Sequence, residues 1–109
     1  MSELRRAVRA DDLIAYQEKA IVSKTLVKLS GGNVTLFAFD AGEELSEHTS
    51  PYEALIYVVD GEARVTIAGE AHTVARGEMI ALPAGWPHAV KAEQAFKMLL
   101  ILIKGETGP

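Results

Sequence analysis

Turn signals recur along this chain at short, regular intervals, and that spacing restricts the fold more than any other feature of the sequence. Between the turns lie segments of about 5–8 residues that are rich in Val, Ile, Leu, Phe and Thr. The turn signals are Ser30-Gly31-Gly32-Asn33, Asp40-Ala41-Gly42, Asp60-Gly61, Ala68-Gly69-Glu70, Arg76-Gly77-Glu78, Pro83-Ala84-Gly85 and Glu93-Gln94. This rhythm predicts a sandwich or barrel of short antiparallel strands.

Individual segments have the residue pattern of strands. Ala63–Ile67 alternates small or apolar side chains with polar ones, which is typical of a half-buried strand. Asp60-Gly61 is a hairpin signal and predicts that this strand pairs with Leu55–Val59. Val34–Phe39 and Phe96–Ile103 are apolar on both faces, so we expect each of them to be covered on both sides.

The length of 109 residues corresponds to one domain. We expect an N-terminal segment over residues 1–20 and a core barrel over about residues 21–104. Within the N-terminal segment, Ala10–Ala20 predicts a helical turn, with Asp11 or Asp12 as its N-cap.

Composition excludes several classes of function. The chain has 11 Lys and Arg against 15 Asp and Glu, which gives a net charge of −4. This charge argues against nucleic-acid binding, because a nucleic-acid partner needs a concentrated basic patch. Cysteine is absent, which excludes disulfides, thiolate metal ligands and cysteine nucleophiles. No run approaches the ~20 apolar residues of a membrane helix, and no apolar stretch follows the basic N-terminal residues as in a secretory signal. We therefore expect a cytoplasmic protein that binds neither nucleic acid nor membrane.

Two stretches of the chain resemble the two sequence motifs of the cupin superfamily. The positions that match in residue type and spacing are Gly42, His48 and Gly61 in the first motif and Gly77, Pro83, Gly85 and His88 in the second. The resemblance implies an all-β fold, a cupin-type jelly-roll β-barrel of short antiparallel strands. It spans the middle of the chain, and the flanking segments fit the same barrel.

The resemblance also implies a metal site in which four ligands converge from adjacent strands. This sequence keeps two of them, His48 and His88, and has Ser50 at the position of a further His and Ala54 at the position of the Glu. Glu53 is one residue away from that last position, and a one-residue offset turns a strand side chain to the opposite face unless a bulge intervenes. Two imidazoles fill half of a tetrahedral shell, so we expect at most weak binding of a divalent transition metal such as Zn, Ni, Mn or Fe.

A pocket for a small molecule is expected around the two histidines. The side chains expected to line it are Ser50, Tyr52, Ala54, Trp86, Phe96 and Met98. Most of these are apolar and few are polar, which is the usual composition of a small-molecule site. His72 lies outside both motifs and is expected to have a structural role.

Two functions fit this sequence. One is a cupin that binds a small molecule, because two ligand positions of the family have been replaced. The other is a metal-dependent cupin enzyme of the dioxygenase, isomerase or sugar-acid lyase type, with His48 or His88 available as a general base. Iron oxygenases typically use two His and one carboxylate, and that carboxylate has no equivalent at Ala54.

A homodimer is expected from the doubly apolar strands. Leu99, Ile101 and Ile103 face away from the side of Phe96–Ile103 that should line the barrel. Large apolar patches on a monomer usually mark an interface, and a two-fold contact would bury these three residues.

Overall fold

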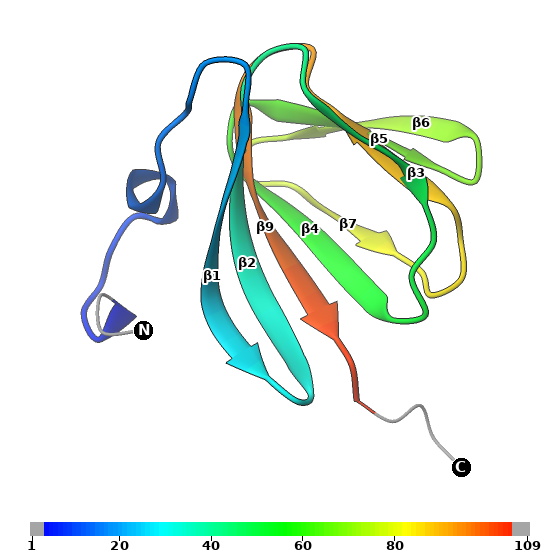
Figure 1. Cartoon of the computed structure of the whole chain (residues 1–109), viewed down its shortest axis with the longest axis horizontal. Helices are drawn as coiled ribbons and strands as arrows, with labels where there is room; N and C mark the ends of the chain where they lie inside the picture. The colour runs from blue at the N-terminus through cyan, green and yellow to red at the C-terminus, as the bar shows by residue number, and fades with distance from the viewer. Residues whose placement is uncertain (1–3, 106–109) are drawn as a thin grey trace.

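The computed structural model describes residues 4–105, which form two facing antiparallel β-sheets (Figure 1). The strands, in chain order, are β1 (Ile21–Leu29), β2 (Gly32–Phe39), β3 (Glu44–His48), β4 (Glu53–Asp60), β5 (Glu62–Ile67), β6 (Glu70–Ala75), β7 (Met79–Leu82), β8 (His88–Lys91) and β9 (Phe96–Ile103). The larger sheet has the order β1-β2-β9-β4-β7 and the smaller sheet the order β3-β8-β5-β6. The expected all-β jelly roll is therefore confirmed.

The core lies between the two sheets and is filled by the inward side chains of alternating strand positions. In β4 and β5 every second residue is buried, as the period of a half-buried strand requires. Phe39 and Phe96 stack with their ring centroids 4.5 Å apart, and Ile56, Val65 and Met98 are at most 1% exposed around them. Burial of each such side chain contributes about 1.5–3 kcal/mol to the hydrophobic driving force.

The strands β4 and β5 do not form the hairpin that Asp60-Gly61 predicts. β4 pairs with β7 and β9 in the larger sheet, whereas β5 pairs with β6 and β8 in the smaller one. Gly61 has φ +69° and carries the chain from one sheet to the other, and a Cβ here would lie 2.5 Å from the carbonyl oxygen of Ala95. The prediction was wrong because an Asp-Gly turn suits two kinds of connection. It can join two strands of one sheet in a hairpin, or it can join a strand of one sheet to a strand of the other.

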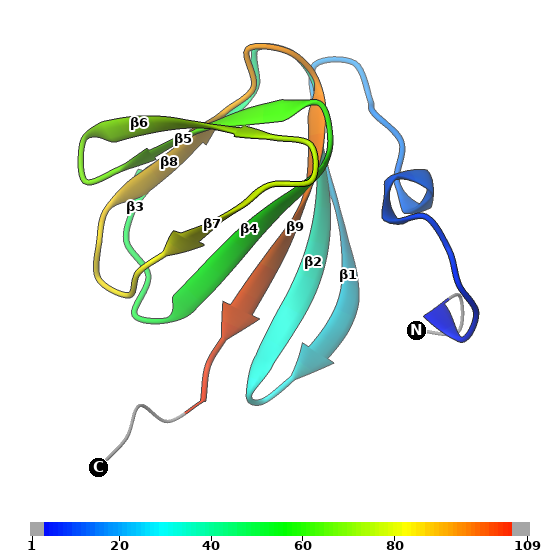
Figure 2. The ribbon, with the colours of Figure 1, turned by 180° about the vertical axis from the view of Figure 1, so that it is seen from behind.

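The N-terminal segment lies against the outer face of the larger sheet, beside β1 and β2 (Figure 2). Ile14 is buried there with Leu36 and Ala38, and Leu99 packs against the same cluster. The segment contains a short 3-10 helix, η2 (Ala10–Leu13), whose N-cap is Arg9 rather than either predicted aspartate. Both aspartates lie inside η2, because the helix begins at Ala10, two or three residues earlier than an N-cap at Asp11 or Asp12 requires.

Side-chain contacts made by Tyr16 and Lys97 hold this segment on the barrel. Tyr16 donates a hydrogen bond from its hydroxyl to the carboxylate of Asp60 at the end of β4. Lys97 of β9 donates from Nζ to the carbonyl oxygen of Asp11 at 2.6 Å, and its Nζ lies 4.8 Å from the centroid of the Tyr16 ring. The segment therefore has polar as well as apolar contacts with the larger sheet. Within residues 4–105, no helix has the length and hydrophobicity needed to cross a membrane.

Candidate metal and ligand site

His48 and His88 are brought together by the pairing of β3 with β8. They are direct partners in this antiparallel ladder, and so are Leu45 and Val90. The two partnered residues are three positions apart on β3 but only two apart on β8, so β3 carries one extra residue between them. This bulge turns His48 to the same side of the sheet as His88, whereas regular alternation would have placed it on the opposite face.

The two imidazole rings approach each other through their Nε2 atoms. The distance between His48 Nε2 and His88 Nε2 is 3.2 Å, with the ring centroids 4.4 Å apart and the ring planes at 68°. Two nitrogen ligands of one metal ion, each bound at about 2.1 Å, lie roughly 3.0–3.4 Å apart. The separation of the two histidines therefore fits a shared divalent metal.

Hydrogen bonds to the main chain fix the orientation of both rings. Nδ1 of His48 lies 2.8 Å from the carbonyl oxygen of Ser46, and Nδ1 of His88 lies 3.2 Å from the carbonyl oxygen of Trp86. A carbonyl oxygen can only accept, so Nδ1 is the protonated nitrogen in each ring. In the neutral imidazoles, Nε2 then carries a lone pair, and the two lone pairs face each other. A metal ion or a proton between the two Nε2 atoms would relieve the repulsion of these lone pairs.

The two rings differ in their exposure. His88 is 6% exposed, whereas His48 lies at the surface. Burial lowers the pKa of His88, although the hydrogen bond to the Trp86 carbonyl opposes this shift, and the neighbouring His48 lowers the pKa further. A lowered pKa favours the neutral form of the ring, which is the form of imidazole that binds metals.

No further metal ligand of the usual kinds joins the pair. Among residues 4–105 no group of three or more His, Cys, Asp or Glu side chains could hold a metal ion together. Ala54 is 5% exposed and lies opposite Leu82 and Leu102. Glu53 pairs with Ile103 where the β4–β9 ladder is regular, so it points to the outer face and away from the histidines.

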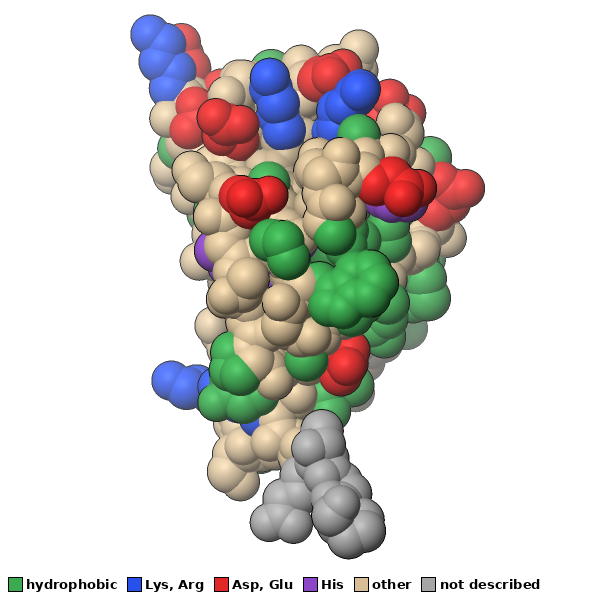
Figure 3. Space-filling model, turned by 90° about the vertical axis from the view of Figure 1, so that its right-hand side faces the viewer, with side chains coloured by type: hydrophobic (Ala, Val, Ile, Leu, Met, Phe, Trp, Pro, Cys, Tyr) green, Lys and Arg blue, Asp and Glu red, His purple; other side chains and the backbone are tan. Residues whose placement is uncertain are grey.

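Ser50, Tyr52 and Trp86 lie on the two loops that adjoin the histidines. Residues 49–52 follow His48, residues 83–87 precede His88, and Gly85 N donates to the Ser50 carbonyl oxygen at 2.8 Å. The Ser50 hydroxyl accepts a hydrogen bond from the backbone of Tyr52 at 3.2 Å. Tyr52 is 39% exposed and Trp86 is 53% exposed. These loops lie on the right of Figure 1, and Figure 3 shows hydrophobic side chains gathered on this face with acidic side chains around them.

Phe96 and Met98 lie deeper than the other expected pocket residues. They are 0% and 1% exposed, and both belong to the main core cluster between the sheets. The six expected pocket residues thus fall into two groups. Ser50, Tyr52 and Trp86 lie on the loops, with Ser50 partly buried, and Ala54, Phe96 and Met98 are buried in the strands.

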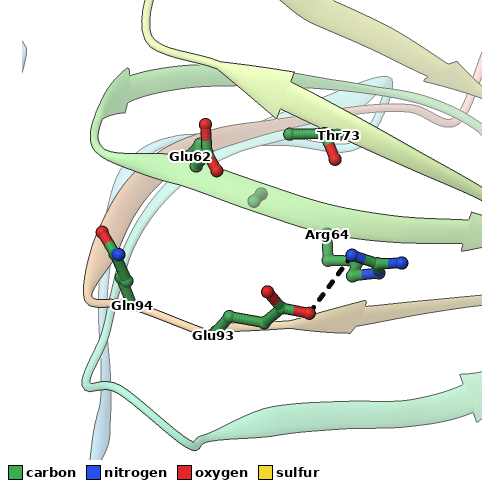
Figure 4. Close-up of a pocket in the computed structure, with 6 residues that line it drawn as sticks. Glu62, Arg64, Thr73, Glu93 and Gln94 are labelled. Carbon is green, nitrogen blue, oxygen red and sulfur yellow. Dashed lines mark hydrogen bonds and ion pairs between the residues drawn. The ribbon is translucent and has the colours of Figure 1, made fainter.

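Three hollows on the described surface are lined by residues other than the two histidines. One is polar and is formed by β5, β6 and the 93–94 turn, where Arg64 forms an ion pair with Glu93 at 3.2 Å (Figure 4). A second, of about 270 Å³, lies between η2 and β4, and a third, of about 250 Å³, is an apolar groove on β1, β2 and β9. In the polar hollow the Arg64 guanidinium already has a carboxylate partner in Glu93.

His72 is separate from the histidine pair. It pairs with Val65 across β5 and β6, and its Nε2 lies 3.8 Å from a carboxylate oxygen of Glu70. Val65 belongs to the buried core, so His72 lies on the inward side of edge strand β6. It does not join His48 and His88 in a cluster of three.

Comparison with known proteins places the chain among the cupins. Its sequence matches the cupin domain family over residues 35–103. Its structure superposes with a TM-score of 0.88 on a conserved protein of unknown function from Streptococcus pyogenes, at 35% identity over 94% of this chain and 90% of that one. A cupin 2 conserved barrel domain protein from Leptotrichia buccalis is 45% identical with a TM-score of 0.84, over 86% of this chain and 46% of that one.

One curated relative is named as an uncharacterized protein. A protein from Streptomyces coelicolor is 38% identical over 56 residues, which are 51% of this chain and 53% of that protein. The match therefore spans about half the length of that relative.

Proposed function

The chain belongs to the cupin domain family, and from this premise we propose that it binds a small molecule at the loops beside His48 and His88, with a divalent transition metal held between the two histidines. The observation that carries the proposal is the convergence of the two Nε2 atoms at 3.2 Å, each ring being oriented through Nδ1 by a backbone carbonyl. Metal-bound histidines commonly have this second hydrogen bond, which fixes the tautomer that presents Nε2. The metal would be Zn, Ni, Mn or Fe.

Two imidazoles leave at least two coordination positions for water or for oxygen atoms of the ligand. We expect weak, exchangeable metal binding, because no described carboxylate adds charge to the site. When bound, the metal would act as a Lewis acid toward an oxygen of the ligand. Trp86 and Tyr52 would contact the ligand through their exposed aromatic surfaces, and Ser50 would contribute a hydroxyl group.

Binding is proposed rather than catalysis because neither histidine has an acid partner. A general base accepts a proton from the reacting group, and an acid partner is needed to return a proton later in the reaction. The hydrogen bonds at Nδ1 of both rings go to carbonyl oxygens, which can orient a ring but do not exchange protons with it.

Calorimetric titration of chelator-treated protein with Ni²⁺ and Zn²⁺ tests the metal part of the proposal. The parent should bind one metal per chain, and His48→Ala and His88→Ala should each lose at least tenfold in affinity. His72→Ala is the matched control, because it removes the third histidine of the chain from outside the pair. Unchanged affinity in His48→Ala, or an equal loss in His72→Ala, would refute metal binding at this pair. Native mass spectrometry of freshly purified protein tests for a bound small molecule.

A further inference from the structure

The hollow between η2 and β4 is built by two separate parts of the chain. The N-terminal segment contributes Arg9, Ala10 and Asp11, and the barrel contributes residues 57–59 of β4 together with Arg76 and Gly77 from the turn before β7. Its volume of about 270 Å³ is several times the ~30 Å³ that one water molecule occupies in the liquid, so a small organic molecule fits. Neither His48 nor His88 lines it, so this hollow is separate from the histidine pair.

Two guanidinium groups line the hollow from opposite walls. Arg9 forms an ion pair with Asp11, in which Nε lies 3.3 Å from Oδ1. Arg76, in contrast, makes no ion pair and no side-chain hydrogen bond within residues 4–105. Two arginines against one aspartate leave a net charge of +1 in the lining, whereas the whole chain has a net charge of −4. The hollow is therefore a positive site on an acidic protein.

The carboxylate of Asp11 is influenced by both arginines. The hydrogen bond from Arg9 lowers the pKa of Asp11, and the charge of Arg76 lowers it further, whereas burial opposes these shifts. The ion pair with Arg9 is exposed, and exposed ion pairs contribute little to stability. An oxyanion in the hollow can therefore share Arg9 with Asp11 and use the free donors of Arg76. A planar guanidinium presents its N–H groups in the geometry that a carboxylate or phosphate accepts.

Tyr57 and Val59 add an apolar wall to this charged site. Both line the hollow and are partly buried. Tyr57 pairs with Leu99, which packs on the outer face of the larger sheet beside the N-terminal segment. The Tyr57 hydroxyl has no hydrogen-bond partner within the described part of the chain. An aromatic side chain and a valine beside two guanidinium groups favour an organic anion over a bare inorganic ion.

We propose that this hollow binds a small organic anion, either a carboxylate or a phosphate monoester, with its oxyanion group between Arg9 and Arg76. The apolar part of the ligand contacts Tyr57 and Val59. The ligand thus joins the N-terminal segment to the barrel, and it stabilises the docked position of that segment because it binds only when both walls are in place. This site is independent of the metal and the ligand proposed for the histidine pair.

Titration of chelator-treated protein with three small probes, followed through the NMR signals of the probe, tests the chemistry of the site. Phenyl phosphate and benzoate should both bind saturably, and phenyl phosphate should bind more tightly because it carries more negative charge. Benzyl alcohol, which has the same ring and no charge, should not bind. Arg76→Gln should weaken the binding of both anions by about tenfold or more, because charge-assisted hydrogen bonds are lost.

Two matched variants control for the site. Arg64→Gln removes another exposed arginine, from the smaller sheet, and should bind both anions as the parent does. His48→Ala should also bind them as the parent does, because the histidine pair lies outside the hollow. Absence of binding by both anions, equal binding of benzyl alcohol, or an equal loss in Arg64→Gln would overturn the proposal.

Hydrogen exchange measured by mass spectrometry tests where the probe binds. Phenyl phosphate should slow exchange in residues 4–20 of the parent and leave residues 62–75, which form β5 and β6, unchanged. Arg76→Gln should show no such slowing, although Arg76 is exposed and its replacement should not disturb folding. Binding of phenyl phosphate with no slowing in residues 4–20, or with slowing only in residues 62–75, would place the site elsewhere and overturn the proposal.

Discussion

His48 and His88 are each held through Nδ1 by the carbonyl oxygen of the residue two positions earlier, Ser46 and Trp86 respectively. The two rings come from neighbouring antiparallel strands, so the same local contact directs both Nε2 atoms to one point. This arrangement accounts for the proposed metal site without a third protein ligand.

Restoring the two replaced ligand positions should strengthen metal binding. Ser50→His with Ala54→Glu introduces larger side chains, so we expect the metal-free variant to lose about 1–3 kcal/mol of stability. A metal that binds only the folded state adds about 2.7 kcal/mol at a hundredfold excess over its dissociation constant. The melting temperature should therefore rise more with Ni²⁺ or Zn²⁺ in the double variant than in the parent.

A variant with Ser50→His and Ala54→Gln is the control for that experiment, because Gln matches the size of Glu and lacks its charge. If the parent already shows the full rise in melting temperature, a ligand other than these two completes its site.

Trp86 should report metal binding through its fluorescence. It is the only tryptophan of the chain, and its carbonyl oxygen contacts Nδ1 of His88. Ni²⁺ has unpaired electrons and quenches a nearby excited indole, whereas Zn²⁺ does not. We expect saturable quenching of the parent by Ni²⁺, no comparable quenching by Zn²⁺, and loss of the Ni²⁺ effect in His48→Ala. Equal quenching of the parent and His48→Ala would mean that Ni²⁺ binds elsewhere.

Tyr16 should make stability depend on pH in the alkaline range. Burial raises the pKa of Tyr16, and the hydrogen bond to Asp60 raises it further. Above its ordinary pKa of about 10, the unfolded chain releases the phenolic proton while the folded protein keeps it. The unfolded state then binds fewer protons, so stability should fall as the pH rises from about 10 toward the raised pKa.

Tyr16→Phe should lose this alkaline dependence. It should also be less stable at neutral pH by roughly 1 kcal/mol, because a hydrogen bond to a carboxylate is lost. Thermal melts at pH 8, 10 and 11 measure both effects. Identical alkaline losses of melting temperature in parent and variant would contradict the role given to Tyr16.

Gly61 should tolerate substitution less well than another turn glycine with similar backbone geometry. Gly61→Ala brings a Cβ within 2.5 Å of the Ala95 carbonyl oxygen, so the connection between the two sheets must shift. Gly69 has φ +84° but no atom within 4 Å of the corresponding Cβ position. We expect Gly69→Ala to cost about 1 kcal/mol for backbone strain alone and Gly61→Ala to cost at least 1 kcal/mol more. Chemical denaturation of the two variants compares them, and equal losses would contradict the close approach.

The fold could be predicted from the sequence because turn signals and apolar side chains recur at regular intervals along the chain. Turn spacing and strand alternation specify short antiparallel strands, and the spacing from Gly77 to His88 identifies the second histidine strand. The turn signal at Gly61 could not show whether the chain makes a hairpin or crosses to the other sheet. That choice depends on which distant strands pair with β4 and β5.

The histidine positions were predicted from the sequence, but the geometry of the site was not. The bulge that turns His48 toward His88 is a property of the pairing between β3 and β8, so the residues of β3 alone do not reveal it. The acceptors that orient the rings are backbone carbonyls, which every residue possesses, so no residue type marks them. The contacts of Lys97 with Asp11 and Tyr16 join residues more than eighty positions apart and likewise leave no pattern in the sequence.

Anomalous diffraction from crystals soaked with Zn²⁺, recorded on both sides of the zinc absorption edge, tests the central claim most directly. The account predicts one strong anomalous peak about 2.1 Å from Nε2 of both His48 and His88, with the remaining coordination positions filled by water or a small molecule. A crystal with no peak between these two nitrogens, or with its strongest peak beside His72 and Glu70, would contradict it.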